Sequence, residues 1–225
     1  MTLPRSLENC IPAYGRRPLL AAIALQSVVY WGTKLITGAW PHRIMATALD
    51  DAFPLLPWMT VVYFGSYLFW VVNYILAVRQ GEENAWRFLA ADTLGKQVCM
   101  IFFLAIPTTV VRPAVPENAP FGWLLALLYA ADVPDNLFPS IHCFNSWLCW
   151  AGIRGRKGVS AGYRAFSLIA TLLIGVSTLA TKQHVVVDVV TGFALAELCW
   201  LLAGHTKLAA LYGAAAGKAR AGASQ

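Results

Sequence analysis

Residues 163–203 read YRAFSLIATLLIGVSTLATKQHVVVDVVTGFALAELCWLLA, which is two long apolar runs, 163–180 and 184–203, joined by a short polar connection. Each run is close to the roughly 20 mostly apolar residues that a helix needs to cross a bilayer. We therefore predict two consecutive transmembrane helices. Their connection places Lys182, Gln183 and the start of the second helix at one membrane boundary.

Four further apolar runs have the same character. They cover residues 18–40, 58–78, 97–111 and 139–153. A shorter run, 121–131, predicts an interfacial or re-entrant helix before the fourth span. The predicted fold class is all-α, a polytopic membrane protein with a bundle of six transmembrane helices over residues 18–206. Residues 1–17 and 207–225 are expected to be a cytoplasmic N-terminal segment and a flexible cytoplasmic tail.

Composition agrees with a membrane protein that has no separate soluble domain. The chain is 58% hydrophobic and 12% charged, whereas soluble domains carry about 25% charged residues. The net charge of +6 arises from basic residues at the ends of apolar runs. They form no clustered basic face, so we expect no nucleic-acid partner.

The distribution of Lys and Arg predicts the orientation. Of the 17 residues, 13, including Lys96, fall on one side of the predicted spans, and only Lys34, Arg43, Arg112 and Lys182 fall on the other. Cytoplasmic loops carry the excess of Lys and Arg. Both termini are therefore expected in the cytoplasm, with the chain in a cell (inner) membrane.

Metal and cofactor sites are not expected. The five cysteines, Cys10, Cys99, Cys143, Cys149 and Cys199, show no paired ligand spacing and are predicted to be free thiols, mostly buried. Two histidines with one aspartate would make a sparse metal site.

The sixth predicted span carries an unusual pair, His184 and Asp188, among five valines. Residues four apart lie on one face of a helix. The carboxylate can then accept a hydrogen bond from one ring nitrogen and leave the other free to attack. Ionisable groups in spans are expensive and indicate function. The alternative is a buried pair in which the two side chains hydrogen-bond to each other and have no further role.

The fourth predicted span opens with Phe138-Pro139-Ser140-Ile141-His142. Serine suits an N-cap, proline suits a helix start, and the free N–H groups there attract anions. His142 could bind phosphate or donate a proton, although a plain capped helix is the alternative. Arg112 and Lys182 end on the same side and could hold phosphate oxygens, while Arg112 alone is typical of an interfacial anchor.

These motifs resemble those of the type 2 phosphatidic acid phosphatase superfamily, whose membrane members have six spans. The stretch Pro139-Ser140-Ile141-His142 is similar to its PSGH motif, with Ile141 in place of glycine. Ser177, His184 and Asp188 match the spacing of its SRxxxxxHxxxD motif. The resemblance covers about residues 96–202.

The chain departs from the family pattern at two positions. Thr178 stands where the third motif has arginine, and Lys182 is the candidate replacement. The KxxxxxxRP motif survives only as Arg112 and its following proline, because Ala105 stands where the lysine belongs. A PS-aliphatic-H motif without that lysine also resembles the lipid phosphotransferase branch, such as inositol phosphorylceramide and sphingomyelin synthases.

The resemblance implies a set of site residues. It assigns a nucleophile to His184, its orientation to Asp188, a general acid to His142, and phosphate binding to Arg112 and Ser140; Lys182 and Ser177 complete the predicted phosphate ligands. The remaining polar residues have less specific interpretations. Asp132, Asp135 and Asn136 fit a polar turn, with contact to a lipid head group as the alternative. Glu197 could pair with a basic group or extend toward the interface, and the sequence names no partner for it.

The expected function is a metal-independent membrane lipid phosphatase. It would hydrolyse a lipid phosphate monoester or pyrophosphate through a phosphohistidine at the extracytoplasmic face, with lipids as its partners. A lipid phosphotransferase of the same fold is the first alternative. A transporter or scaffold that only binds lipid phosphate is the second, although simple binding does not need an oriented nucleophile.

Overall fold

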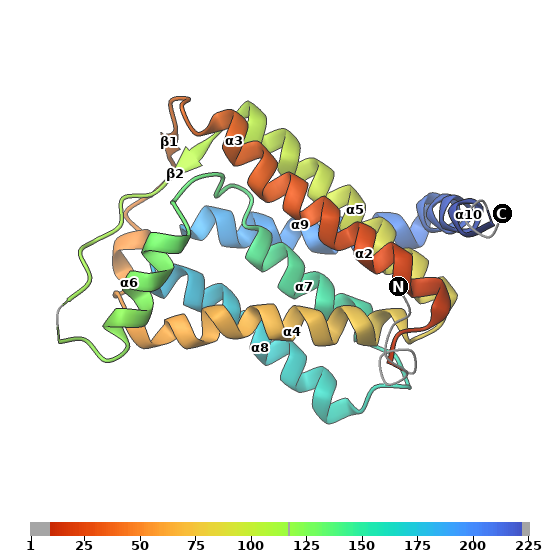
Figure 1. Ribbon diagram of the computed structural model, residues 1–225. Helices are drawn as coiled ribbons and strands as arrows, with labels where there is room; N and C mark the ends of the chain where they lie inside the picture. The colour runs from red at the N-terminus through yellow and green to blue at the C-terminus, as the bar shows by residue number, and fades with distance from the viewer. Residues whose placement is uncertain (1–9, 117, 222–225) are drawn as a thin grey trace.

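The computed structural model describes residues 10–116 and 118–221, and these are mostly helical (Figure 1). The helices are α2 (Ala13–Ser27), a π-helical turn (Val28–Gly32), α3 (Thr33–Thr37), α4 (Thr60–Val78), α5 (Glu82–Ala105), α6 (Gly122–Ala131), α7 (Ile141–Ile153), α8 (Ala161–Ala180), α9 (Val186–His205) and α10 (Leu208–Ala221). Two short strands, β1 (Arg43–Ile44) and β2 (Thr108–Thr109), pair in parallel. The prediction of a mainly helical fold is confirmed.

Five helices in the described chain are long and apolar enough to cross a membrane, which is compatible with a multi-pass membrane protein. They are Ala13–Thr37, Pro57–Val78, Glu82–Ala105, Ala161–Ala180 and Val186–His205. Large apolar side chains such as Leu35, Leu68 and Ile169 are exposed on them. The sequence predicts six spans, but the remaining helix, α7, has only 13 residues. At 1.5 Å per residue it is about 20 Å long.

The third span differs from its prediction. The apolar run at 97–111 suggested a helix there, whereas α5 begins fifteen residues earlier and ends at Ala105. Asp92 and Lys96 obscured its first half, because they interrupt the apolar pattern. Both are buried in the bundle and pair with each other, so Lys96 does not lie at the membrane boundary to which we had assigned it. Pro107 disfavours helical geometry at Ile106 and explains the end of α5.

Helix α7 lies at the centre of the bundle, where it packs against α4, α5, α8 and α9 (Figure 1). Its start approaches α9 closely because residue 192 is glycine. A Cβ atom at Gly192 would lie 2.5 Å from the carbonyl oxygen of Ser140. The absence of a side chain there brings the beginnings of α7 and α9 together.

The bundle has two different ends. Helix α6, which matches the short helix predicted at 121–131, lies at one end with β1 and β2, and α10 lies at the other end with the start of α2 (Figure 1). The predicted flexible tail instead contains helix α10, which packs against α5 and α9. The outer parts of both predicted terminal segments, 1–9 and 222–225, lie outside the described residues.

Candidate active site

His184 and Asp188 are in contact, with 3.3 Å between the histidine Nδ1 and the carboxylate Oδ2. His184 precedes α9, and Asp188 lies in the first turn of that helix. We had predicted that the two residues lie on one face of a single helix. They meet instead across the start of α9. The same carboxylate oxygen accepts the backbone N–H of Val185 at 3.1 Å. Asp188 thus caps α9 and orients the imidazole at once.

The chain around His184 is held by the end of α8. The backbone N–H groups of Gln183 and His184 both donate to the carbonyl oxygen of Thr178, at 2.9 and 3.1 Å. His184 is only 7% exposed. Because Nδ1 faces a carboxylate, it carries the proton, and Nε2 is then the ring nitrogen with a free lone pair.

His142 lies in the first turn of α7 and faces His184, with 6.0 Å between the ring centroids. Three aromatic rings of α4 surround it: Tyr63, Trp70 and Tyr67, with centroids at 4.4, 5.0 and 5.8 Å. Its Nε2 atom is buried and has no hydrogen-bond partner within residues 10–116 and 118–221. The structure thus brings together two histidines that lie on different helices.

Ser140 joins the two helix starts. Its hydroxyl accepts the N–H of Cys143 at 3.3 Å, as expected of an N-cap. Its own N–H donates to the carbonyl oxygen of Asp188 at 3.0 Å. Ser140 is fully buried, and these bonds fix the position of His142 relative to His184.

Arg112 reaches the same region from the segment after β2. One guanidinium nitrogen, Nη1, donates to the carbonyl oxygen of Asp132, and Nη2 donates to Oε1 of Gln183, each at 2.5 Å. The guanidinium lies 4.8 Å from the ring centroid of Tyr129. Burial lowers the pKa of Arg112, and the Asp132 carboxylate acts in the opposite direction. Arginine remains a cation under such conditions.

Two predicted phosphate ligands point elsewhere. The Lys182 ammonium donates to the carbonyl oxygens of Asp50 and Phe53, at 3.1 and 2.6 Å. Lys182 has a positive φ of 54°. Ser177 is fully buried in α8, and its hydroxyl donates to the carbonyl oxygen of Ile174. Such back-bonding is a common alternative for serine in a helix.

A charged cluster lies beside the histidines, at residues for which a polar turn was the favoured prediction and contact with a head group the alternative. Lys34 Nζ lies 2.9 Å from Asp132 Oδ1 and 2.7 Å from Asp135 Oδ1. Tyr63 and Tyr30 both donate hydrogen bonds to the Asp132 carboxylate. Burial acts to raise the pKa of Asp132. The charge of Lys34 and the hydrogen bond from Tyr30 outweigh burial and hold this pKa below its ordinary value. Lys34, a charged residue inside the first predicted span, was the sequence signal that could have revealed this cluster.

His184 lies between two cavities. A space of about 10 Å³, room for about one water, is lined by His142, His184, Gln183, Asp132 and Asp135 among others. A larger cavity of about 300 Å³ is lined by His184, Lys182 and residues near Asp50. Both spaces border His184.

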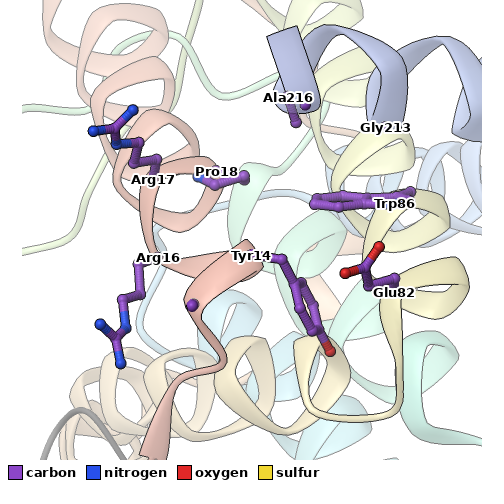
Figure 2. Close-up of a pocket in the computed structure, with 10 residues that line it drawn as sticks. Tyr14, Arg16, Arg17, Pro18, Glu82, Trp86, Gly213 and Ala216 are labelled. Carbon is purple, nitrogen blue, oxygen red and sulfur yellow. The ribbon is translucent and has the colours of Figure 1, made fainter. Parts of the chain in front are cut away.

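A third cavity, about 420 Å³, lies between α2, α5 and α10 at the opposite end. Tyr14 and Trp86 line it, and Figure 2 shows the side chains of Arg16 and Arg17 on the side of α2 away from Trp86. Neither histidine of the pair reaches this cavity. The chemistry-bearing residues gather at the end that carries α6.

Glu197 and the five cysteines are the remaining residues that the sequence singled out. Glu197 accepts hydrogen bonds from both terminal nitrogens of Arg154 and from Trp147, which supplies the partner that the sequence did not reveal. The cysteines are free, and four are buried. In the described part of the chain no group of three or more His, Cys, Asp or Glu residues is placed to hold a metal ion.

Comparisons with protein-family models, curated proteins and solved structures find no match for this chain. Its function has to be inferred from the geometry of the two histidines and their surroundings. That geometry combines an imidazole oriented by a carboxylate, a second buried imidazole, and a fixed arginine.

Proposed function

We propose that the chain is a membrane enzyme that hydrolyses a lipid phosphate monoester or pyrophosphate through a phosphohistidine at His184. The observation that carries this proposal is the contact of His184 Nδ1 with Asp188, opposite a second histidine whose Nε2 is buried and unpartnered in the described chain. A nucleophile with an orienting group and an acid–base partner is the arrangement that covalent catalysis requires.

The reaction divides into two displacements. The lone pair of His184 Nε2 attacks phosphorus, the bond from phosphorus to the leaving oxygen breaks, and His142 gives that oxygen a proton. A water then transfers a proton to His142 and attacks phosphorus, which releases inorganic phosphate and restores His184. Asp188 stabilises the imidazolium formed in the first step, as the aspartate does in a Ser-His-Asp triad. Arg112 offers a fixed positive charge to the phosphoryl oxygens.

The membrane placement completes the proposal. We take α7 as a sixth crossing element, enclosed by the longer helices, and the chain as a protein of the cell (inner) membrane. Leaving Lys96 out of the 13 basic residues on the terminal side gives 12 against four. The asymmetry favours cytoplasmic termini and a site at the extracytoplasmic face. The order of the PSIH and HxxxD motifs, similar to those of the type 2 phosphatidic acid phosphatases, supports the same chemistry.

A lipid phosphotransferase is the second candidate, and the cluster of Lys34, Asp132 and Asp135 favours it. Carboxylates accept hydrogen bonds from hydroxyl groups. An alcohol held there would replace water in the second displacement and yield a phosphodiester lipid.

Trapping the covalent intermediate tests the proposal. Rapid quenching of the native protein with a radiolabelled lipid phosphate should give an acid-labile phosphoenzyme, and His184→Ala should give none. His142→Ala should slow poor leaving groups strongly and spare an aryl phosphate, which departs without a proton. A phosphoenzyme that persists in His184→Ala would remove the assignment.

The same experiment separates the two candidates and the two orientations. Labelled inorganic phosphate as the main product supports hydrolysis, whereas a labelled phosphodiester lipid supports transfer. In sealed vesicles, a water-soluble aryl phosphate should be cleaved only when it is added on the extracytoplasmic side. Cleavage only from the cytoplasmic side would reverse the topology.

A further inference from the structure

Gln183 is a polar residue in an unusual setting, because it is only 2% exposed and lies directly before His184. Its Oε1 accepts a hydrogen bond from Arg112 Nη2 at 2.5 Å. A guanidinium only donates hydrogen bonds, so the amide oxygen has to face Arg112. The orientation of the amide is fixed by chemistry, and its NH2 group is directed the other way.

That NH2 group is buried and has no hydrogen-bond partner within the described ranges. Gln183 lines the same small cavity as His142 and His184. Arg112 leaves a second donor, Nε, in the same state. Buried donors without acceptors are uncommon, and each calls for an explanation such as a catalytic role. Here the bonded pair of Arg112 and Gln183 leaves two such donors, and one of them belongs to a residue that lines the cavity beside the proposed nucleophile.

We propose that the Gln183 carboxamide binds the phosphoryl group, with its Nε2 donating a hydrogen bond to a phosphoryl oxygen. This inference rests on the proposed function. During attack by His184, negative charge on the phosphoryl oxygens meets a donor that is already in place, which is the condition under which such donors stabilise a transition state most. Gln183 supplies the contact that we had expected from Lys182, whose ammonium is held by two carbonyl oxygens.

A purely structural role for Gln183 makes a different prediction. If the side chain served only to hold Arg112, any residue with an acceptor oxygen in the same place would suffice. Gln183→Glu keeps that acceptor and replaces the NH2 group with oxygen. Gln183→Met has a similar length and removes both groups. Gln80→Glu is the matched control, since the Nε2 of Gln80 donates to the carbonyl oxygen of Leu76, far along the sequence from either histidine.

The experiment uses the full chain in lipid nanodiscs, with two measurements for each variant. Inorganic phosphate binding is measured from its competition with turnover and from the rise in unfolding temperature that it causes. The rate constant kcat is measured with the best lipid phosphate substrate of the native protein. We expect Gln183→Glu and Gln183→Met each to lower kcat by about 100-fold or more and to weaken phosphate binding. Gln80→Glu should match the native protein in both.

The outcomes separate the two proposals. Native-like turnover in Gln183→Glu, with loss only in Gln183→Met, would mean that Gln183 merely positions Arg112, and would overturn the inference alone. Should Gln183→Met not fold, Gln183→Glu decides by itself. Equal losses in Gln80→Glu would also overturn the inference. A native protein that neither binds inorganic phosphate nor releases it from any lipid phosphate would overturn the inference together with the proposed function.

Discussion

The protein holds a buried and a partly buried charged cluster, and they differ in what surrounds them. In the middle of α5, Lys96 Nζ lies 2.9 Å from Asp92 Oδ2 and donates to the carbonyl oxygen of Ala22. Tyr74 donates to the other carboxylate oxygen. At the end of the bundle that holds the two histidines, Lys34 pairs with Asp132 and Asp135, which lie 98 and more residues further along the chain.

The difference lies in the neighbouring polar atoms. Around Asp92 and Lys96 each charged group has its partners, and neither residue lines one of the three cavities described above. Beside Asp132, by contrast, lie the small cavity and the nitrogens of His142 and Gln183 that have no hydrogen-bond partner in the described part of the chain. A buried ion pair whose charged groups all have partners is explained by the fold alone. A partly buried charged cluster next to nitrogens without partners indicates a ligand.

The largest effect on stability should come from breaking the pair of Asp92 and Lys96, which we call the inner pair. Asp92→Asn or Lys96→Met alone leaves one buried charge without its partner and should lower the unfolding free energy by about 3–5 kcal/mol. The double variant should recover most of that loss, because neither charge remains. Thermal unfolding in one detergent, measured for the full double-mutant cycle, provides the test.

The contrast between the clusters depends on the activity of these variants. Folded Asp92→Asn protein should keep the native kcat, because the pair touches neither histidine. A folded variant without turnover would show that the inner pair belongs to the site after all, and the distinction between the two clusters would disappear.

A smaller effect is expected where the site is attached to the bundle. Gly192→Ala forces a Cβ atom toward the Ser140 carbonyl oxygen and the Cys143 side chain. Such overpacking should cost about 1–3 kcal/mol. The turnover should fall by about 100-fold, because a shift of about 1 Å between reacting groups has that consequence.

The matched control is Gly162→Ala in α8, where a Cβ atom would meet nothing within 4 Å. Its unfolding temperature should stay the same or rise, and its turnover should not change. If Gly192→Ala behaved like this control, the close approach of α7 and α9 would not determine the site geometry.

The smallest effect on stability should come from the cluster of Lys34, Asp132 and Asp135, which we call the outer cluster. Asp135→Asn leaves Lys34 paired with Asp132 and should cost about 1 kcal/mol, the usual net value of one hydrogen bond. Its KM for a lipid phosphate with a hydroxylated head group should nevertheless rise about 10-fold, equivalent to about 1.4 kcal/mol. The control is Glu83→Gln, an exposed carboxylate in the first turn of α5. An unchanged KM would make the outer cluster structural, like the inner one.

Local sequence patterns predicted the parts of the site that are local in structure. The apolar runs gave five of the helices, α4, α6, α7, α8 and α9, to within two residues at each end. The N-cap at Ser140 and the contact of His184 with Asp188 are present as expected. The span at α5 was misplaced because charge in a single sequence does not reveal whether it is paired. Asp92 and Lys96 pair one turn apart, and their burial became evident only in the bundle.

The sequence patterns did not predict contacts between segments that lie far apart along the chain. Lys34 meets Asp132 across 98 residues, and Arg112 meets Gln183 across 71. Lys182 was the natural choice for a phosphate ligand by charge, yet its backbone conformation directs it to two carbonyl oxygens. Charge alone does not reveal these two partners, because side-chain direction depends on backbone angles that a sequence does not display.

The short, central helix α7 also bears on how the protein is made. At about 20 Å it falls short of the roughly 30 Å hydrocarbon core, and it buries His142, Asn145 and Ser146. A segment of this kind gains little from lipid when it leaves the ribosome. It becomes stable only against α4 and α5, which precede it in synthesis, and α8 and α9, which follow. Integration of α7 is therefore expected to be late and cooperative, with the histidines meeting last of all.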